Sequence, residues 1–266
     1  MQELKEALKG RVGWSIFLTA VAIRVLDWSL SSYSHDEFSA LLRLSQTHSW
    51  TSFWESAVMV DAHPAGVQAW LTGWVKFGDF LGVTQHGSAE WWVKLPFLAV
   101  SLSGLWALVL MVRRAAGREA AWLTLACWAG LQWPVLQSAI ARPYAPGLAL
   151  VLWAGAMLLE PRLKRRNIRL ALVLALAAYM HHFAALQVAF LWSFAMIFGP
   201  KHDRLELWKS AALAALIYAP HVPVLLHQFG HGGLGSFLDK PSPSFFVSYL
   251  RLLLNDSAML WLLLGL

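Results

Sequence analysis

Long apolar runs separated by short polar connections dominate the hydropathy pattern of this chain. Eight runs suit a membrane-spanning helix, which needs about 20 predominantly apolar residues. They cover residues 12–32, 91–112, 119–140, 143–159, 167–183, 184–199, 207–227 and 245–266. The pattern predicts an all-α fold, a polytopic transmembrane helix bundle of about eight spans.

The connection between the first two runs, residues 33–90, contains two stretches with a helical period and a polar face. After Pro64 the apolar positions are Val67, Trp70, Leu71, Trp74 and Val75. The opposite face carries Gln68, Thr72, Lys76 and Asp79. A shorter stretch begins near Asp36 and has Phe38, Leu41 and Leu42 on one face. Such helices lie in the membrane interface, so we predict two interfacial amphipathic helices, the second over 64–82.

The composition supports a membrane protein, because 58% of the residues are hydrophobic and only 14% are charged. Soluble domains carry about 25% charged residues. Cys127 is the only cysteine, which excludes an internal disulfide. The first run carries Arg24 and Asp27 and lacks a small-residue cleavage pattern, so we interpret it as a retained span. Few other ionisable groups lie deep in the predicted spans, which argues against a transporter.

The 21 Lys and Arg residues orient the predicted bundle. With a cytoplasmic N-terminus, 14 of them fall on the inner side and six on the outer side, and one lies in the first span. The positive-inside rule favours this orientation. It also accounts for the net charge of +6 without a nucleic-acid partner. We expect a multi-pass protein of the bacterial cytoplasmic membrane with its site on the outer face, where nine of the ten histidines fall.

We treat residues 1–266 as a single transmembrane module with a second outer loop at about 228–244. The chain closes on "AMLWLLLGL", without a polar tail. This ending suggests either a C-terminally truncated chain or a minimal core.

The stretch "SSYSHDEF" places Asp36 and Glu37 where the chain leaves the first span. Ser34 followed three residues later by Glu37 is the pattern of a capping box, and acids in a first turn suit the helix dipole. The alternative is that the two carboxylates carry chemistry at the membrane surface. The two interpretations are compatible, with Glu37 capping and Asp36 reacting.

In "VDAHPAG", Asp61 and His63 are two residues apart, before a proline that can open a helix. They either cap that helix or hold a divalent metal ion. In the second case His227 or His231, from the late outer loop, would complete the site.

Two further outer-side motifs carry candidate binding residues. In "ARPYAPG", Arg142 is placed either to bind a phosphate or to extend to the interface, and Tyr144 suits an aromatic belt equally well. In "YMHHFAAL", His181 and His182 diverge by about 100° if helical. One of these histidines would then face the loop site and the other the bundle.

These motifs, in this order, resemble the membrane glycosyltransferases of the GT-C fold, the group that includes protein O-mannosyltransferases and lipid A aminoarabinose transferases. The resemblance rests on "HDEF", "DAHPAG", "ARPYAPGLAL", "YMHHFAAL", "IYAPHVPVLLHQF" and the paired spans around "MVRRAAGREAAWL". It covers residues 12 to about 230.

The resemblance implies an enzyme that transfers a sugar from a polyprenyl-phosphate carrier to an acceptor on the outer face, with inversion. Asp36 would be the base or orienting carboxylate, and Glu37 lies beside it. Asp61 and His63 would match the family's acid or His-Pro motif, and Arg142 would bind the lipid phosphate. Tyr144, His181 and His182 would line the substrate site, beside a membrane lipid and an acceptor of unknown type.

The chain departs from the family in having fewer spans and no soluble outer domain. The rival hypothesis is therefore a non-catalytic scaffold or lipid-binding subunit of the same architecture. The enzyme hypothesis requires Asp36, Asp61 or His63, and Arg142 to converge.

Overall fold

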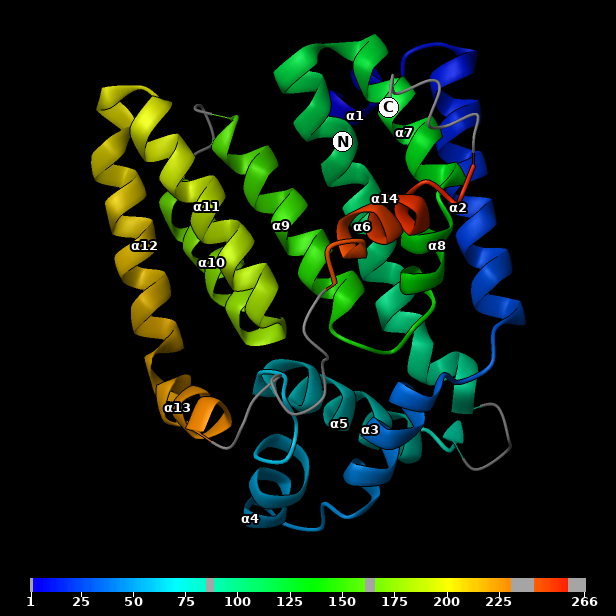
Figure 1. Cartoon of the computed structure of the whole chain (residues 1–266), viewed down its shortest axis with the longest axis vertical. Coiled ribbons are helices and arrows are strands. Elements are labelled where there is room, and N and C mark those ends of the chain that lie inside the picture. Colours follow the sequence, from blue (N-terminus) through cyan, green and yellow to red (C-terminus); the bar gives the residue numbers. More distant parts are fainter. Residues whose placement is uncertain (1, 85–88, 161–165, 231–241, 258–266) are drawn as a thin grey trace.

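The computed structural model describes residues 2–84, 89–160, 166–230 and 242–257, and every regular element in these ranges is helical (Figure 1). The all-α prediction is confirmed for this part of the chain.

Three helices among the described residues are long and apolar enough to cross a membrane. They are α2 (Arg11–Leu30), α6 (Ala89–Ala116) and the helical segment Lys201–Gly230. Three shorter apolar helices accompany them, α9 (Tyr144–Leu158), α10 (Arg166–Met180) and α11 (His182–Phe198). These lengths are consistent with a membrane protein, while the eight spans and the GT-C fold stay predictions.

The segment Lys201–Gly230 consists of four pieces, η3 (Lys201–Asp203), α12 (Arg204–Tyr218), η4 (Ala219–His221) and α13 (Val222–Gly230). Pro220 and Pro223 lie where the segment bends, because each proline removes a backbone donor and crowds the preceding turn. In Figure 1, α13 turns away from α12 and lies across its lower end.

The bundle is held by close contacts between apolar helices. α6 packs against α9, α10 against both α9 and α12, and α2 against α7 (Arg118–Gly130). A Cβ added at Gly104 would come within 3.2 Å of the Cβ of Ala149. The small residue thus lets the α6 and α9 backbones approach, as is common between membrane helices.

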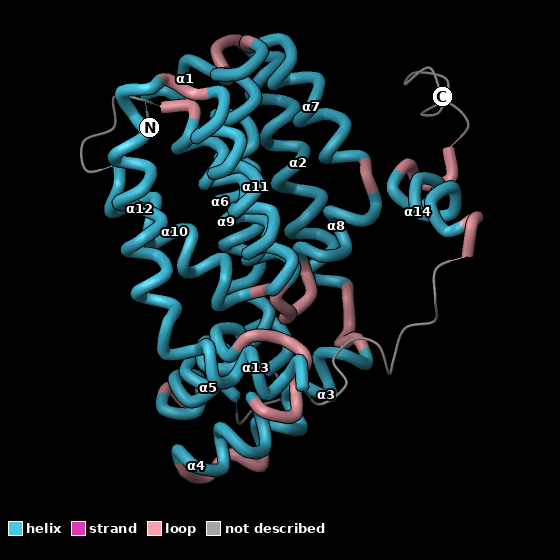
Figure 2. Tube along the Cα trace, turned by 60° about the vertical axis from the view of Figure 1, so that its left-hand side comes forward, coloured by secondary structure: helices cyan, strands magenta, loops and turns pink. Residues whose placement is uncertain are grey.

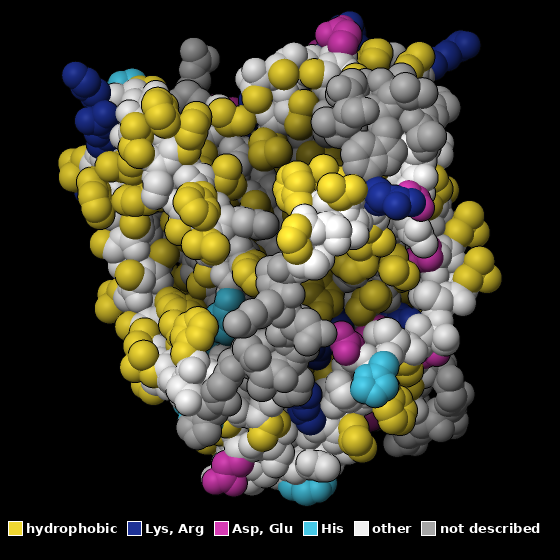
Figure 3. Space-filling model, viewed as in Figure 1, with side chains coloured by type: hydrophobic (Ala, Val, Ile, Leu, Met, Phe, Trp, Pro, Cys, Tyr) yellow, Lys and Arg dark blue, Asp and Glu magenta, His cyan; other side chains and the backbone are white. Residues whose placement is uncertain are grey.

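The outward faces of the long helices remain apolar. On α11 the exposed side chains include Phe183, Leu186, Phe190, Phe194 and Ile197. In Figure 3 hydrophobic side chains cover most of the visible middle of the molecule, and several Lys and Arg side chains lie near its upper end. A water-exposed surface of this kind would be unusual, whereas lipid would cover it without cost.

The two ends of the bundle differ. α1 (Gln2–Ala7), the α6–α7 turn and η3 lie at one end, and α3 (His35–Ser45), α5 (Ala65–Phe80) and α13 lie at the other (Figures 1 and 2). The described segments predicted to be cytoplasmic therefore share one end of the molecule, as the charge-based orientation requires.

That orientation gives a testable result. In a Cys127→Ser background, we expect Trp50→Cys to react with a membrane-impermeant maleimide added to intact cells or right-side-out vesicles. Lys201→Cys should react only after permeabilisation. The opposite pattern would reverse the orientation.

Both predicted interfacial segments are helical, as α3 and α5. The sequence pattern missed a helical stretch between them, α4 (Trp50–Ser52) and the π-helix η1 (Phe53–Val58). Gln68 was placed on the polar face of the second helix, but it is buried and only 1% exposed. Its amide is hydrogen-bonded to Asp61, which compensates for its burial.

The predicted span 119–140 is wrong as one continuous helix. It breaks at Leu131 into α7 and α8 (Gln132–Ser138), because Pro134 cannot continue the ladder and crowds the carbonyl of Gly130. The Asn255 side chain hydrogen-bonds backbone groups on both sides of this break. Its Nδ2 donates to the Gly130 carbonyl at 2.8 Å, and its Oδ1 accepts from Gln132 N at 2.7 Å.

The predicted span 245–266 also ends early. α14 covers only Phe245–Leu253, and Asn255 and Asp256 have positive φ angles of 55° and 54° that end the helix. Residues 258–266 lie outside the described residues, as does most of the predicted late outer loop.

Candidate functional site

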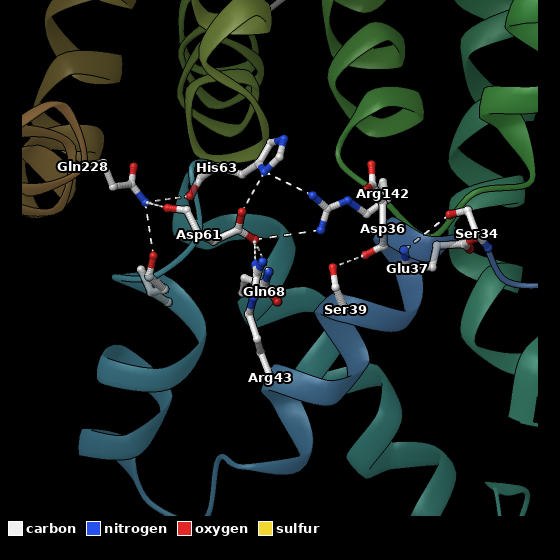
Figure 4. A network of polar contacts seen from close by, with 11 residues as sticks. Ser34, Asp36, Glu37, Ser39, Arg43, Asp61, His63, Gln68, Arg142 and Gln228 are labelled. Carbon is white, nitrogen blue, oxygen red and sulfur yellow. Dashed lines mark hydrogen bonds and ion pairs between the residues drawn. The ribbon is translucent and has the colours of Figure 1, made fainter. Parts of the chain in front are cut away.

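Asp61, His63 and Arg142 come together at the end of the bundle where α3 and α5 lie (Figure 4). Asp61 and His63 belong to the loop between η1 and α5, and Arg142 belongs to the turn before α9. The contact between His63 and Arg142 joins positions 79 residues apart in the chain.

The N-terminus of α3 is fixed by a capping box and by a long-range bond. Ser34 Oγ accepts from Glu37 N, and Glu37 Oε2 accepts from Ser34 N at 2.7 Å. Glu37 Oε1 accepts from Ala141 N at 2.6 Å, across 104 positions. Glu37 therefore ties the first turn of α3 to the residue that precedes Arg142.

Lys94 of α6 stabilises the same region, where Glu37 of α3 is hydrogen-bonded to Ala141. Its ammonium is buried and donates to the carbonyls of Ser31 and Ser32, at 3.0 and 2.9 Å, and to Glu90 Oε1 at 3.0 Å. It lies 4.0 Å from Glu37 Oε1. Lys94 thus balances the buried charge of Glu37, so Glu37 acts as a structural residue here and its predicted catalytic role finds no support in these contacts.

The neighbouring acids should respond differently to neutralisation. Glu37→Gln removes the charge that holds Ser34, Ala141 and Lys94, and we expect it to lower the free energy of unfolding by about 1–3 kcal/mol. Asp36→Asn, at an exposed position in the same helical turn, should cost less than about 1 kcal/mol. Denaturation of the two purified variants tests this, and equal losses would contradict the assignment.

Asp61 is the centre of the cluster and is 5% exposed. Its Oδ1 lies 2.8 Å from His63 Nδ1, and its Oδ2 lies 2.5 Å from Gln68 Nε2 and 3.0 Å from an Nη atom of Arg43. Burial alone would raise the pKa of Asp61, but the hydrogen bond from His63 and the charges of the neighbouring cations outweigh it. The pKa therefore lies well below its usual range, and the carboxylate is charged at neutral pH.

The contacts of His63 determine its tautomer. Nδ1 faces both Asp61 Oδ1 and, at 3.2 Å, an Nη atom of Arg142. A charged carboxylate can only accept, so Nδ1 carries a hydrogen that it donates to Asp61. Nε2 of a neutral His63 is then an acceptor, and Figure 4 shows this ring nitrogen pointing away from Asp61.

Arg142 is a buried guanidinium whose donors are incompletely used. The residue is 5% exposed, and its Nε has no hydrogen-bond partner among the described residues. One Nη atom is 3.9 Å from Asp61 Oδ2, and the other faces the protonated nitrogen of His63. Two guanidinium groups, those of Arg43 and Arg142, thus adjoin one carboxylate, which leaves an excess of positive charge.

Gln228 of α13 fixes the loop that carries Asp61 and His63. Its Nε2 lies 3.2, 2.9 and 2.8 Å from the carbonyl oxygens of Val58, Asp61 and His63. The end of the last long helical segment is thereby coupled to the site.

The prediction placed His181 and His182 in one helix, but His181 has an extended backbone as the N-cap of α11, which begins at His182. His181 caps α11 by accepting from Phe183 N at 3.0 Å, and its ring lies beside those of His63 and Tyr144, with centroids 5.4 and 5.7 Å away. Burial, aided by the neighbouring cations, lowers the pKa of His181 to about 4. His182 instead faces Phe229 of α13. His181 and Tyr144 therefore join the edge of the site, and His182 does not contact Asp61.

Asp36 lies one residue before the bond that ties α3 to Ala141. Its carboxylate is exposed, and in the described part of the chain it has no hydrogen bond or ion pair. No contact joins it directly to Arg142, although Glu37 holds both segments together. Of the predicted set, Asp61, His63 and Arg142 meet in contact, whereas Asp36 makes no contact with them in the described structure and is linked to them only through its neighbour Glu37.

The predicted metal ligands Asp61 and His63 contact each other and other protein groups in this structure. Both oxygens of Asp61 are already engaged, and two guanidinium groups lie beside them. In residues 2–84, 89–160, 166–230 and 242–257, no three His, Cys, Asp or Glu side chains gather as metal ligands would. His227 is therefore not part of such a group, and His231 lies outside the described residues.

Sequence reasoning missed three members of the site, namely Arg43, Gln68 and Gln228. Arg43 lies in the last turn of α3, where a basic residue suits the helix dipole, so the sequence offered an ordinary structural explanation for it. Only the three-dimensional structure brings it to Asp61.

A comparison of the chain with protein-family models, curated proteins and solved structures finds no match. The case for a function therefore rests on the geometry of this cluster and on the motifs that led to it.

Proposed function

We propose that the protein is a membrane glycosyltransferase that transfers a sugar from a polyprenyl-phosphate carrier to an acceptor at the outer face of the membrane. The observation that carries the proposal is the buried, incompletely paired Arg142 beside Arg43, Asp61 and His63. Guanidinium groups with free donors bind phosphate oxygens, and buried ones do so strongly.

The roles follow from charge and exposure. Arg142 and Arg43 bind the phosphate of the donor, and Asp61 holds both guanidiniums in place. His63 and Arg43 are the more accessible side chains of the cluster, at 19% and 30% exposed, whereas those of Asp61 and Arg142 are 4% and 6% exposed. Nε2 of a neutral His63 accepts a hydrogen bond from a sugar hydroxyl, and Tyr144 and His181 line the edge of the site.

Asp36 is the proposed base. The acceptor hydroxyl gives its proton to the Asp36 carboxylate as its oxygen bonds to the anomeric carbon of the sugar. The bond from that carbon to the phosphate oxygen breaks, and its electron pair leaves with polyprenyl phosphate. The two guanidiniums stabilise the charge that develops on this phosphate. A single displacement inverts the anomeric carbon.

This reaction requires no metal ion, because the arginines supply the positive charge that a divalent cation would otherwise provide to the leaving phosphate. A metal at Asp61 and His63 remains a prediction, and the contacts of Asp61 do not favour it.

Donor hydrolysis tests the proposal most simply. The purified chain in liposomes is given a panel of polyprenyl-phosphate sugars labelled in the sugar, and release of water-soluble label is followed without an acceptor. We expect slow release from at least one donor. Saturable donor binding with no release from any of them, and no transfer to added lipid, glycan or peptide acceptors, would favour the non-catalytic subunit instead.

A further inference from the structure

A cavity lies beside α5, outside the cluster around Asp61. It has a volume of about 560 Å³ and is bordered by α4, η1, α5, the end of α10 and η4. Its wall includes Ala65 and Gly66, which follow His63 and Pro64 in the chain. The volume lies in the range of sites that bind small molecules.

The wall is mostly apolar and aromatic. Trp50, Phe53 and Trp54 form one side, and their rings contact one another with centroids 5.5–5.8 Å apart. Tyr179 lies on the other side. An occupant would therefore place an apolar body against these rings.

Three hydroxyls of the wall are already hydrogen-bonded within the protein, whereas the buried Nδ1 of His221 has no partner among the described residues. The hydroxyls of Thr47, Thr72 and Tyr179 donate to the carbonyls of Leu44, Gln68 and Ile217. His221 Nε2 accepts from Ala65 N at 2.9 Å. These hydroxyls have no donor left for a ligand, which makes the cavity poorly suited to a bare polyol.

Among the described residues that line this wall, Lys76 is the one with a charged side chain. In the described part of the chain its ammonium has no ion pair or hydrogen bond. Lys76 also borders an adjoining cavity of about 490 Å³, which shares Thr47 and Thr72 with the first and has Leu41, Leu44 and Val93 in its wall. The wall of this adjoining cavity also carries the carboxylate of Asp79, which accepts a hydrogen bond from the Thr84 hydroxyl. One free cation thus stands where two largely apolar cavities meet.

We propose that this pair of cavities binds an anionic amphiphile, with its negative group at Lys76 and its apolar part against Trp50, Phe53 and Trp54. The position next to His63 makes this molecule the acceptor in the reaction, an assignment that rests on the proposed function. The binding itself does not depend on that function.

Three variants at two positions test the binding without the donor. Lys76→Glu reverses the charge, and Lys76→Arg retains it. Gly73→Phe fills the cavity, because a Cβ at Gly73 meets no atom within 4 Å and the position lies inside α5, where any side chain other than proline favours the helix over glycine. Lys201→Glu and Gly130→Phe are matched controls, since Lys201 is exposed at the other end and Gly130 is equally open.

The measurement is calorimetric titration of the detergent-solubilised protein with dioctanoyl phosphatidylglycerol, dioctanoyl phosphatidylcholine and inorganic phosphate. We expect saturable binding of the phosphatidylglycerol, about tenfold weaker binding of the phosphatidylcholine, and none of phosphate alone. Lys76→Glu should weaken phosphatidylglycerol binding about tenfold or more, Lys76→Arg should retain it, and Gly73→Phe should abolish it. The controls should bind as the wild type does.

Equal binding of the two lipids, or wild-type affinity in both Lys76→Glu and Gly73→Phe, would overturn the binding proposal. Donor hydrolysis is measured separately and without any amphiphile. Hydrolysis with no lipid binding would leave the proposed function standing and remove this inference. Lipid binding with no hydrolysis of any donor would leave the binding proposal standing and remove the proposed function.

Discussion

Replacing Arg142 by alanine is expected to raise the KM for the polyprenyl-phosphate donor about tenfold or more. The guanidinium is buried beside Asp61 and His63, and its Nε has no partner within the described residues. Under the proposed function, the donor phosphate would supply the missing partner. Arg142→Lys should recover only part of the affinity, because an ammonium cannot form the two parallel bonds of a guanidinium.

The measurement is the donor dependence of sugar release by purified variants. Arg118→Ala serves as the control, because Arg118 is an exposed arginine at the other end of the bundle. Thermal unfolding of Arg142→Ala separates lost binding from lost structure. A folded variant with an unchanged donor KM would show that the phosphate binds elsewhere.

Neutralising Asp36 is expected to lower kcat about 100-fold or more while the donor KM stays close to that of the wild type. The carboxylate is exposed and has no hydrogen bond or ion pair in the described structure, so its removal leaves no buried group unsatisfied. A helix-capping acid would behave differently, since its loss would affect stability and leave turnover unchanged.

Initial rates at saturating donor and acceptor, together with unfolding curves, distinguish the two roles of Asp36. Glu55→Gln is the matched control, an exposed acid of the same outer segment in η1. If Asp36→Asn and Glu55→Gln both turn over at the wild-type rate, the base must be another residue. His63 is then the next candidate, because its Nε2 points away from Asp61.

Much of the helical framework could be predicted from the sequence, because apolar runs and capping patterns are local. The first span was expected over 12–32 and α2 covers Arg11–Leu30, and the interfacial segment expected over 64–82 is α5 (Ala65–Phe80). The Ser34–Glu37 capping box follows from two residues three apart and is present.

The errors have identifiable physical causes. The apolar run 119–140 hides a break, because Pro134 overrides the hydropathy of its surroundings. Gln68 falls on the polar stripe of its helix, but Asp61 supplies a buried partner that the periodicity cannot reveal. The described part of the run 245–266 ends at Asn255 and Asp256, whose positive φ angles stop the helix.

The candidate site could be predicted in part. Asp61, His63 and Arg142 were singled out by their residue types and their expected outer placement, and they are in contact. The Glu37–Ala141 bond and the approach of Arg43 to Asp61 could not be foreseen, because they join distant segments through tertiary packing. Because the Glu37–Ala141 bond gives Glu37 a structural role, Asp36 is the acid of this pair that remains exposed.

The most direct test of the central claim is the release of polyprenyl phosphate from a labelled polyprenyl-phosphate sugar by the purified wild-type chain in liposomes, with Asp36→Asn in the same liposomes as the reference. The account predicts time-dependent release by the wild type from at least one donor, and about 100-fold slower release by Asp36→Asn. Equal rates in the two samples, or no release from any donor in the presence of lipid, glycan and peptide acceptors, would contradict it.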